Sequence, residues 1–287
     1  MNCSEQVSNV NEFISAIGRI YDGWNESGKQ GCNKFLFFRG HYSEQWELIP
    51  SVLRNGIYDE KEISLDFKQV CPMHTSDFHP IDDINKMLVE MQHYELPTRL
   101  LDWTISPLVA LFFACYAETP SQDEQKADAI VWVLNPWKVY KYFIEQNQTL
   151  SGKTLPSCYM DINIVARSLL AYKWTAGEIA QYIQDKFHYS IDLVEYQSAL
   201  PYIAKYRNDR IVAQRRAFTI FGEQTCALNF QSGYKNSSNL QCIKILEEHK
   251  KPILDELNKL CINEYTIYPD YVGMNKMIRS RRGLFNI

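Results

Sequence analysis

The chain has 287 residues, a formal net charge of −4 and a hydrophobic content of 46%, which is typical of a globular protein with a sizeable core. This composition excludes a disordered chain, and the net charge gives no overall attraction for nucleic acid. No run of about 18 apolar residues is present, so we expect no membrane span. The N-terminus lacks a basic start and an apolar stretch, which predicts a cytoplasmic protein without a secretory signal. The eight cysteines are scattered without close pairs, so we expect no disulfide framework.

Hydrophobic periodicity predicts helices and strands that do not alternate regularly along the chain. Helices are expected at 10–24, 59–70, 82–91, 106–116, 136–145, 161–174, 175–187 and 251–260, with a last helix after Pro269. Strands are expected at 34–40, 128–134, 200–205, 217–222 and 240–246. This order favours an α+β fold with a single mixed, largely antiparallel sheet and flanking helices over a doubly wound parallel sheet. The strands at 35–38, 130–134 and 218–221 should share that sheet, with the 106–116 helix packed against it.

The predicted elements indicate one domain over residues 1–287. Residues 1–33 form an N-terminal helical segment, and residues 136–190 form a helical insertion within the domain. The second insertion helix follows a capping box, Thr175-Ala176-Gly177-Glu178, whose side chains bond first-turn N–H groups reciprocally. No internal repeat or low-complexity tract interrupts this organisation.

The stretch Gln92–Ala114 contains the highest concentration of candidate functional side chains in the chain. Its first half, up to Thr104, combines ionisable and aromatic side chains with Pro97, which predicts a strand or an irregular loop. Its second half is a buried helix, because Ser106 suits the N-cap, Pro107 suits the first helical position and the following residues are nearly all apolar. Polar side chains fixed to the start of a buried helix need partners inside the protein or a ligand.

The strand at 34–40 is apolar on both faces and ends at Arg39 beside Gly40, where backbone or a ligand can approach closely. An arginine at a strand end is as often paired with a surface acid as it is part of a site. We do not expect a metal, because the spacing of Cys71, His74 and His79 matches no common zinc pattern and prolines interrupt the segment.

Several motifs together resemble the FRG domain family. They are Phe38-Arg39-Gly40, Gln92-His93-Tyr94, Leu96–Thr104 and Ser106–Ala114, followed by Arg210-Ile211, Gln214, Phe218-Thr219 and Tyr268-Pro269-Asp270. The resemblance extends from about Lys34 to Asp270. The family is bacterial, and membership implies a tie to toxin and anti-phage systems, with an antitoxin as a partner.

A second resemblance is to a family of enzymes and implies a reaction. Phe38-Arg39-Gly40, followed by Thr104–Pro107 and Ala110–Ala114, is similar to the first two signatures of arginine-serine-glutamate type ADP-ribosyltransferases. It implies their fold and NAD as substrate, with the strand-end arginine on the NAD phosphates. Loss of nicotinamide develops an oxocarbenium ion, which needs an arginine for the diphosphate, an aromatic for the leaving ring and a carboxylate near the ribose.

The glutamate of those transferases has no clear equivalent, because no Glu-x-Glu pair is present. The candidates for the acid are Asp102, Asp209 and Glu223, and His93 would help to shape the ribose site. The candidate cofactor-binding residues are Arg39, Gly40, Gln92, Tyr94, Thr98, Arg99, Trp103, Thr104, Ser106 and Gln214. Alternatively, Arg99 and Asp102 pair with each other and only hold the loop.

The leading hypothesis is an ADP-ribosyltransferase-like enzyme that uses NAD, as a bacterial toxin or anti-phage defence effector acting on a protein or nucleic acid. The alternative is a non-catalytic nucleotide-binding or nucleic-acid-sensing module that uses the same pocket. A nuclease is less favoured, because no clustered carboxylates mark a two-metal site. We also predict that Arg39, His93 and Asp102 converge, because isolated buried charges would be too costly.

Overall fold

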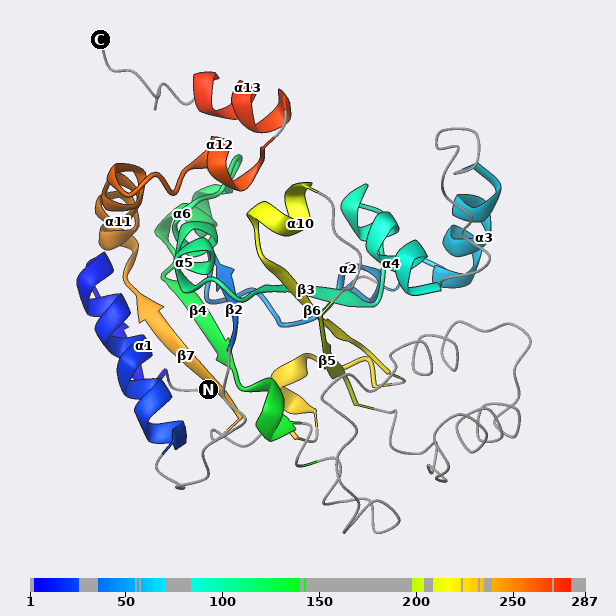
Figure 1. The fold of residues 1–287 in the computed structure, drawn as a ribbon, viewed down its shortest axis with the longest axis horizontal. Helices are drawn as coiled ribbons and strands as arrows, with labels where there is room; N and C mark the ends of the chain where they lie inside the picture. Colours follow the sequence, from blue (N-terminus) through cyan, green and yellow to red (C-terminus); the bar gives the residue numbers. More distant parts are fainter. Residues whose placement is uncertain are drawn as a thin grey trace.

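A computed structural model describes residues 3–25, 36–54, 56, 58–70, 84–139, 142, 198–203, 209–222, 224–231, 233–234, 239–269 and 271–279. Within these ranges, seven strands form one sheet in the order β1-β7-β4-β2-β3-β6-β5 (Figure 1). The strands are β1 Glu5–Val7, β2 Phe37–His41, β3 Leu100–Thr104, β4 Ala129–Leu134, β5 Leu200–Tyr202, β6 Arg216–Ile220 and β7 Leu240–Ile245. Only the β1–β7 pair is parallel, so the predicted α+β fold with a single mixed sheet is confirmed.

The predicted central strands share this sheet. β2 pairs with β4 from Phe37–Leu134 to His41–Ile130, and β3 connects β2 to β6. The short strand β1 was not predicted. It has only three residues, of which Val7 alone is buried, so it carries no alternating pattern that could be recognised.

Helices flank the sheet (Figure 1). They are α1 Val10–Asn25, α2 Ser51–Arg54, α3 Glu60–Val70, α4 Ile84–His93, α5 Pro107–Cys115, α6 Gln122–Lys126, α10 Asp209–Ala213, α11 Glu247–Lys259, α12 Glu264–Ile267 and α13 Tyr271–Arg279. The helices predicted at 10–24, 59–70, 82–91, 106–116 and 251–260 correspond to α1, α3, α4, α5 and α11, with shifted ends. The insertion predicted at 136–190 lies almost wholly outside the described residues. None of the helices within the described ranges is long and apolar enough to cross a membrane.

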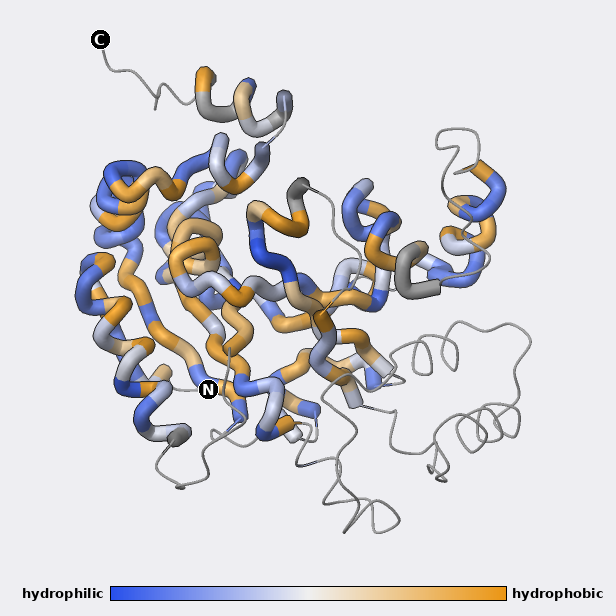
Figure 2. The backbone as a smooth tube through the Cα atoms, in the orientation of Figure 1, coloured by the Kyte–Doolittle hydropathy of each residue, from blue (hydrophilic) through white to orange (hydrophobic). Residues whose placement is uncertain are grey.

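One face of the sheet packs against α1, α5 and α11. Buried side chains such as Phe13, Phe112 and Leu257 meet strand residues such as Phe38 and Val131 there. In Figure 2 the strands and α5 are largely hydrophobic, whereas the outer turns of α1 and α11 carry hydrophilic residues. Burial of this continuous apolar layer is the main stabilising contribution to the fold.

The opposite face carries a second hydrophobic core. Leu101, Trp103 and Trp132 of the sheet pack there against Leu48, which follows β2, and against Tyr234, which precedes β7. Because β-strand side chains alternate between faces, Leu101 and Trp103 point into this core, whereas Asp102 and Thr104 lie on the other face of β3.

The start of α5 differs in detail from its prediction. Ser106 occupies the N-cap position and Pro107 the first turn, but the Ser106 side chain accepts no capping hydrogen bond. Instead, the Ser106 N–H donates to Oγ1 of Thr104 over 3.0 Å, and its carbonyl accepts from the Ala110 N–H over 3.2 Å. The turn into the helix is therefore fixed by β3 rather than by a serine cap.

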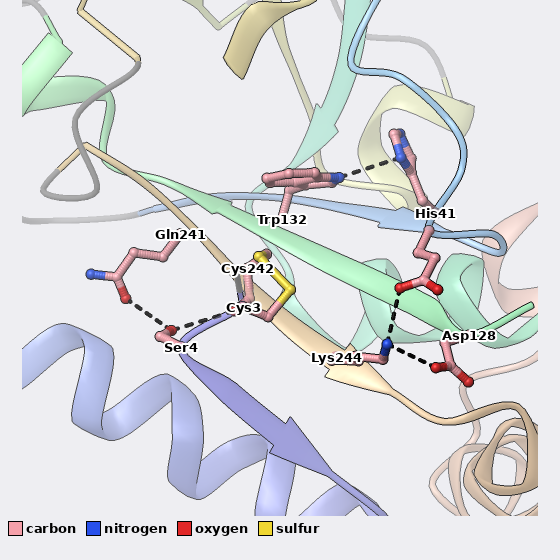
Figure 3. Close-up of a disulfide and its surroundings, with 9 residues drawn as sticks. Cys3, Ser4, His41, Asp128, Trp132, Gln241, Cys242 and Lys244 are labelled. Carbon is pink, nitrogen blue, oxygen red and sulfur yellow. Dashed lines mark hydrogen bonds and ion pairs between the residues drawn. A yellow bond between two sulfur atoms is a disulfide. The ribbon is translucent and has the colours of Figure 1, made fainter. Parts of the chain in front are cut away.

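The cysteines also differ from their prediction. Cys3 and Cys242 form a disulfide that joins the segment before β1 to β7 (Figure 3). Ser4 adds a backbone hydrogen bond of 3.2 Å to the Cys242 carbonyl. The sequence predicted no disulfide framework and did not indicate this single disulfide, because two cysteines separated by 239 positions become neighbours only when β1 joins the sheet.

Candidate functional site

The sheet opens between β2 and β3. Their register contains one pair, Phe38 with Thr104, whereas β2 and β4 pair along five residues. Past this pair the guanidinium of Arg39 bridges the two strands, because its Nη1 donates to the main-chain oxygen of Asp102 over 2.6 Å. The side chain thus occupies a place that a backbone hydrogen bond fills in a regular sheet.

A cavity of about 530 Å³ lies at this opening. Its lining comes from β2 and the segment after it, from β3, α5, the segment between α5 and α6, α6, β6 with the residue Gln214 before it, and the segment between α12 and α13. It includes Arg39, Asp102, Phe113, Glu118, Arg216 and Tyr268. The volume is in the range of small-molecule sites, and a mixture of aromatic walls with a few convergent polar groups is typical of them.

The anchors of Arg39 are uncharged. Its Nε donates to Nε2 of His41 over 3.0 Å, and its Nη1 donates to the Asp102 carbonyl. Among the described residues no carboxylate forms an ion pair with it, and its Nη2 has no acceptor. Burial lowers the pKa of Arg39 to about 10, an effect that Asp102 opposes and the nearby Arg54 increases. The guanidinium therefore remains a cation at neutral pH, and its charge is directed toward the cavity.

The Asp102 carboxylate has one satisfied and one unsatisfied oxygen. Oδ2 accepts from Nε2 of Gln92 over 2.5 Å. Oδ1 is buried without a hydrogen-bond donor, and the nearest cation is Nη1 of Arg216 at 3.7 Å. A buried acceptor without a partner is costly, so this oxygen is suited to a donor from a ligand.

Arg216 lies beside Asp102 because β3 pairs Thr104 with Arg216 in the sheet. Its Nε donates to Oε1 of Gln214 over 2.6 Å, and Gln214 in turn donates to the Ile267 carbonyl over 3.2 Å. This chain of hydrogen bonds connects β6 to α12 and holds one wall of the cavity. The predicted site residue Gln214 and the unpredicted Arg216 thus act on the same wall.

The loop before β3 is held by interactions that do not line the cavity. Thr98 donates its hydroxyl to Oε1 of Gln92. Arg99 forms a largely buried ion pair with Glu60 of α3, with Nη2 and Oε2 at 2.5 Å. Arg99 therefore pairs with Glu60 and not with Asp102, which corrects the alternative in which those two residues hold the loop.

Of the three residues predicted to converge, Arg39 and Asp102 meet at the cavity. His93 is not among the residues that line it, and its ring lies against Tyr94 with centroids 5.0 Å apart. The Tyr94 side chain is 59% exposed on the surface beyond α4. The aromatic residues that line the cavity are instead Phe38, Trp46, Trp103, Phe113, Tyr116 and Tyr268.

Three predicted residues, Gly40, Trp103 and Thr104, line the cavity and also have structural roles. A Cβ on Gly40 would overlap the main chain of α5 at Ala110 and Ala114, so glycine allows the helix to pack closely on β2. The Thr104 hydroxyl donates to the Gln214 carbonyl over 2.6 Å. The indole of Trp103 belongs to the core of the other sheet face and donates to Oγ1 of Thr219 over 3.1 Å.

The side chains of two candidate acids lie outside the described part of the structure. Asp209 begins α10, but its side chain lies outside the description, and Glu223 lies outside the described residues. Cys71, His74 and His79 also lie outside them. Among the described residues, no group of three or more His, Cys, Asp and Glu side chains could hold a metal ion.

His41 and Arg216 are the main site residues that sequence reasoning missed. His41 follows Arg39 by two positions on β2, so strand alternation places both on one face. This spacing could have been recognised from the sequence. Nothing in the local sequence of Arg216 indicated a site, because its neighbour Asp102 comes from another strand.

These features define an α+β protein with a polar, aromatic-lined cavity where two strands of its sheet diverge. Comparison with protein families adds one finding: residues 34–123 match the family model of the FRG domain. The matched segment includes Arg39, His41, Gln92 and Asp102. No curated protein and no solved structure matches the chain. The motifs proposed from Arg210 to Asp270 lie beyond the match.

Proposed function

We propose that the cavity binds NAD and that the protein is an ADP-ribosyltransferase-like enzyme. The observation that carries this proposal is the cationic edge of Arg39, which forms no ion pair with the described residues, has uncharged anchors and faces an aromatic-lined cavity. A diphosphate is an acceptor for such an edge, because guanidinium N–H groups match phosphate oxygens in geometry and charge. Phe113 and Tyr268, whose rings meet edge to face at 6.3 Å, offer a wall for a nucleotide ring.

In this proposal, Asp102 faces the ribose. The bond between C1 of the ribose and the nicotinamide nitrogen breaks, and its electron pair leaves with nicotinamide. An acceptor nucleophile forms the new bond to C1 and loses its proton. The carboxylate stabilises the positive charge that develops on the ribose. Its Oδ1, which accepts no hydrogen bond from the described residues, is the atom available for this role.

The biological setting follows from the FRG resemblance and stays a proposal. The protein would act as a bacterial toxin or anti-phage effector, with a protein or nucleic acid as target and an antitoxin as partner. The cytoplasmic location also stays a prediction. NAD is the proposed substrate, and no metal is required by this chemistry.

A second candidate is a nucleotide-binding module without turnover. It is favoured by the position of Asp102 between the Gln92 amide and Arg216, because these groups already compensate part of the carboxylate charge. The two candidates share the binding step and differ only in the role of the acid.

The experiment is to measure NAD binding by calorimetry and nicotinamide release in cell extract, for the wild type and for Asp102→Asn. The enzyme proposal expects near wild-type binding and a loss of turnover on the order of a hundredfold in Asp102→Asn. Asp255→Asn, an exposed acid on α11, serves as the control and should change neither quantity. NAD binding without nicotinamide release would support the module, and no NAD binding would refute both candidates.

A further inference from the structure

His41 is a polar side chain in a buried position. It is 1% exposed, and it lies opposite Ile130 in the pairing of β2 with β4. Its ring has polar neighbours on both nitrogens. Nε2 lies 3.0 Å from Nε of Arg39, and Nδ1 lies 3.1 Å from the Trp46 carbonyl oxygen. Figure 3 shows the third neighbour, the indole of Trp132, whose Nε1 is 3.3 Å from Nδ1.

These neighbours determine the protonation of the ring. A guanidinium only donates, so Nε2 of His41 must be the unprotonated acceptor. A neutral imidazole then carries its proton on Nδ1 and donates it to the Trp46 carbonyl. A protonated Nδ1 cannot accept, so the longer contact with Trp132 is not a hydrogen bond in this state. The ring therefore holds Arg39 on one side and the segment after β2 on the other.

The kind of acceptor matters for the charge of Arg39. A carboxylate on Nε would form an ion pair and neutralise the cation. An imidazole nitrogen and a main-chain carbonyl fix the plane of the guanidinium without neutralising it. The remaining N–H groups keep their direction and their full charge for another anion.

We propose that His41 is the positioning residue of Arg39, which orients the guanidinium through an uncharged acceptor so that it binds a phosphate-bearing ligand. This inference rests on the proposed function, because it assumes an anion at Arg39. It also predicts a pH dependence. A protonated His41 would present an N–H to the Arg39 N–H and lose the contact.

The charged groups that act on His41 are Arg39 and Arg54. Burial, followed by the charge of Arg39, holds the pKa of His41 well below its ordinary value, the Trp46 carbonyl opposes this, and Arg54 adds to it. The ring is therefore neutral at pH 7, and ligand binding should weaken only under acid conditions, where His41 takes up a proton.

Two variants separate positioning from simple packing. His41→Gln keeps both functions, because its amide oxygen can accept from Arg39 and its NH₂ group can donate to Trp46. His41→Leu keeps most of the volume and removes both. His249→Gln, a surface histidine on α11, is the matched control.

The test measures dissociation constants for NAD and for inorganic pyrophosphate by calorimetry at neutral and acid pH. We expect His41→Leu to weaken binding about tenfold or more, and His41→Gln to stay within about threefold of the wild type. The weakening at acid pH should disappear in His41→Gln, which does not titrate, and persist in His249→Gln. A folded His41→Leu protein with wild-type affinity would overturn the proposal. If His41→Leu does not fold, the pH dependence of the His41→Gln dissociation constant is the test. A flat dependence supports the proposal, and a wild-type dependence overturns it.

An observation without ligand keeps this test separate from that of the proposed function. Nitrogen-15 NMR of the His41 ring distinguishes the two neutral tautomers. A proton on Nδ1, together with an Arg39 Nε–H signal that is lost in His41→Leu, supports the positioning role even if the wild type binds neither NAD nor pyrophosphate. A proton on Nε2 would overturn it.

Discussion

Replacement of Arg39 by alanine should weaken NAD binding by about 1.5–3 kcal/mol, which corresponds to a roughly tenfold to 150-fold rise in Kd. The magnitude follows from the hydrogen bonds of the guanidinium. Nε and one N–H of Nη1 are used by His41 and the Asp102 carbonyl, which leaves the Nη2 edge for the ligand. One charge-assisted contact to phosphate is therefore lost. Arg39→Lys should restore only part of it, because an ammonium cannot contact both anchors and the phosphate in one plane.

The assay is calorimetry with NAD, accompanied by circular dichroism to confirm folding. The stability of Arg39→Ala should fall by no more than about 1.5 kcal/mol, because cavity water can replace the lost donors. Arg19→Ala is the control, since Arg19 is 57% exposed on α1 and pairs only with Glu5. A folded Arg39→Ala protein that binds NAD with unchanged Kd would refute the role of this arginine and the nucleotide proposal.

Further predictions concern stability and can be checked by urea unfolding. Gly40→Ala should cost about 1–3 kcal/mol or more because the new Cβ meets the α5 backbone, whereas Gly18→Ala, with open space around it on α1, should stabilise by about 0.5–1 kcal/mol. Glu60→Gln removes the counter-charge of Arg99 in a site where the two side chains are 9% and 16% exposed, and about 3 kcal/mol should be lost. The pKa of His41 is lowered in the fold, so the unfolded chain binds more protons, and stability should fall by up to about 1.4 kcal/mol per pH unit as the pH drops below the ordinary value of 6.5. A flat profile there would contradict this sign, and His41→Gln should remove the slope. Cys3→Ser should lower the unfolding free energy by about 2–5 kcal/mol, and an unchanged midpoint would show that the disulfide does not contribute.

Local hydrophobic pattern was sufficient for the main elements of the fold. β4 has six consecutive apolar residues and α5 is apolar nearly all round, so each element can be recognised from its own sequence. β1 could not be found in this way, because its three residues become a strand only through pairing with β7. The capping box that starts the short polar helix α6 was present in the sequence, but α6 buries no residue and so leaves no hydrophobic period.

The sequence also predicted that Arg39 and Asp102 converge, because isolated buried charges would be too costly, and both residues line one cavity. Their partners were decided by tertiary structure. Arg99 lies at the bend before β3 and pairs with Glu60 of α3, whereas Asp102 lies within the strand. The register of β3 with β6 brings Arg216 beside Asp102. The single pairing between β2 and β3 leaves Arg39 to bridge the strands through the Asp102 carbonyl. Side-chain partners depend on register and strand divergence, which long-range packing sets and no local pattern encodes.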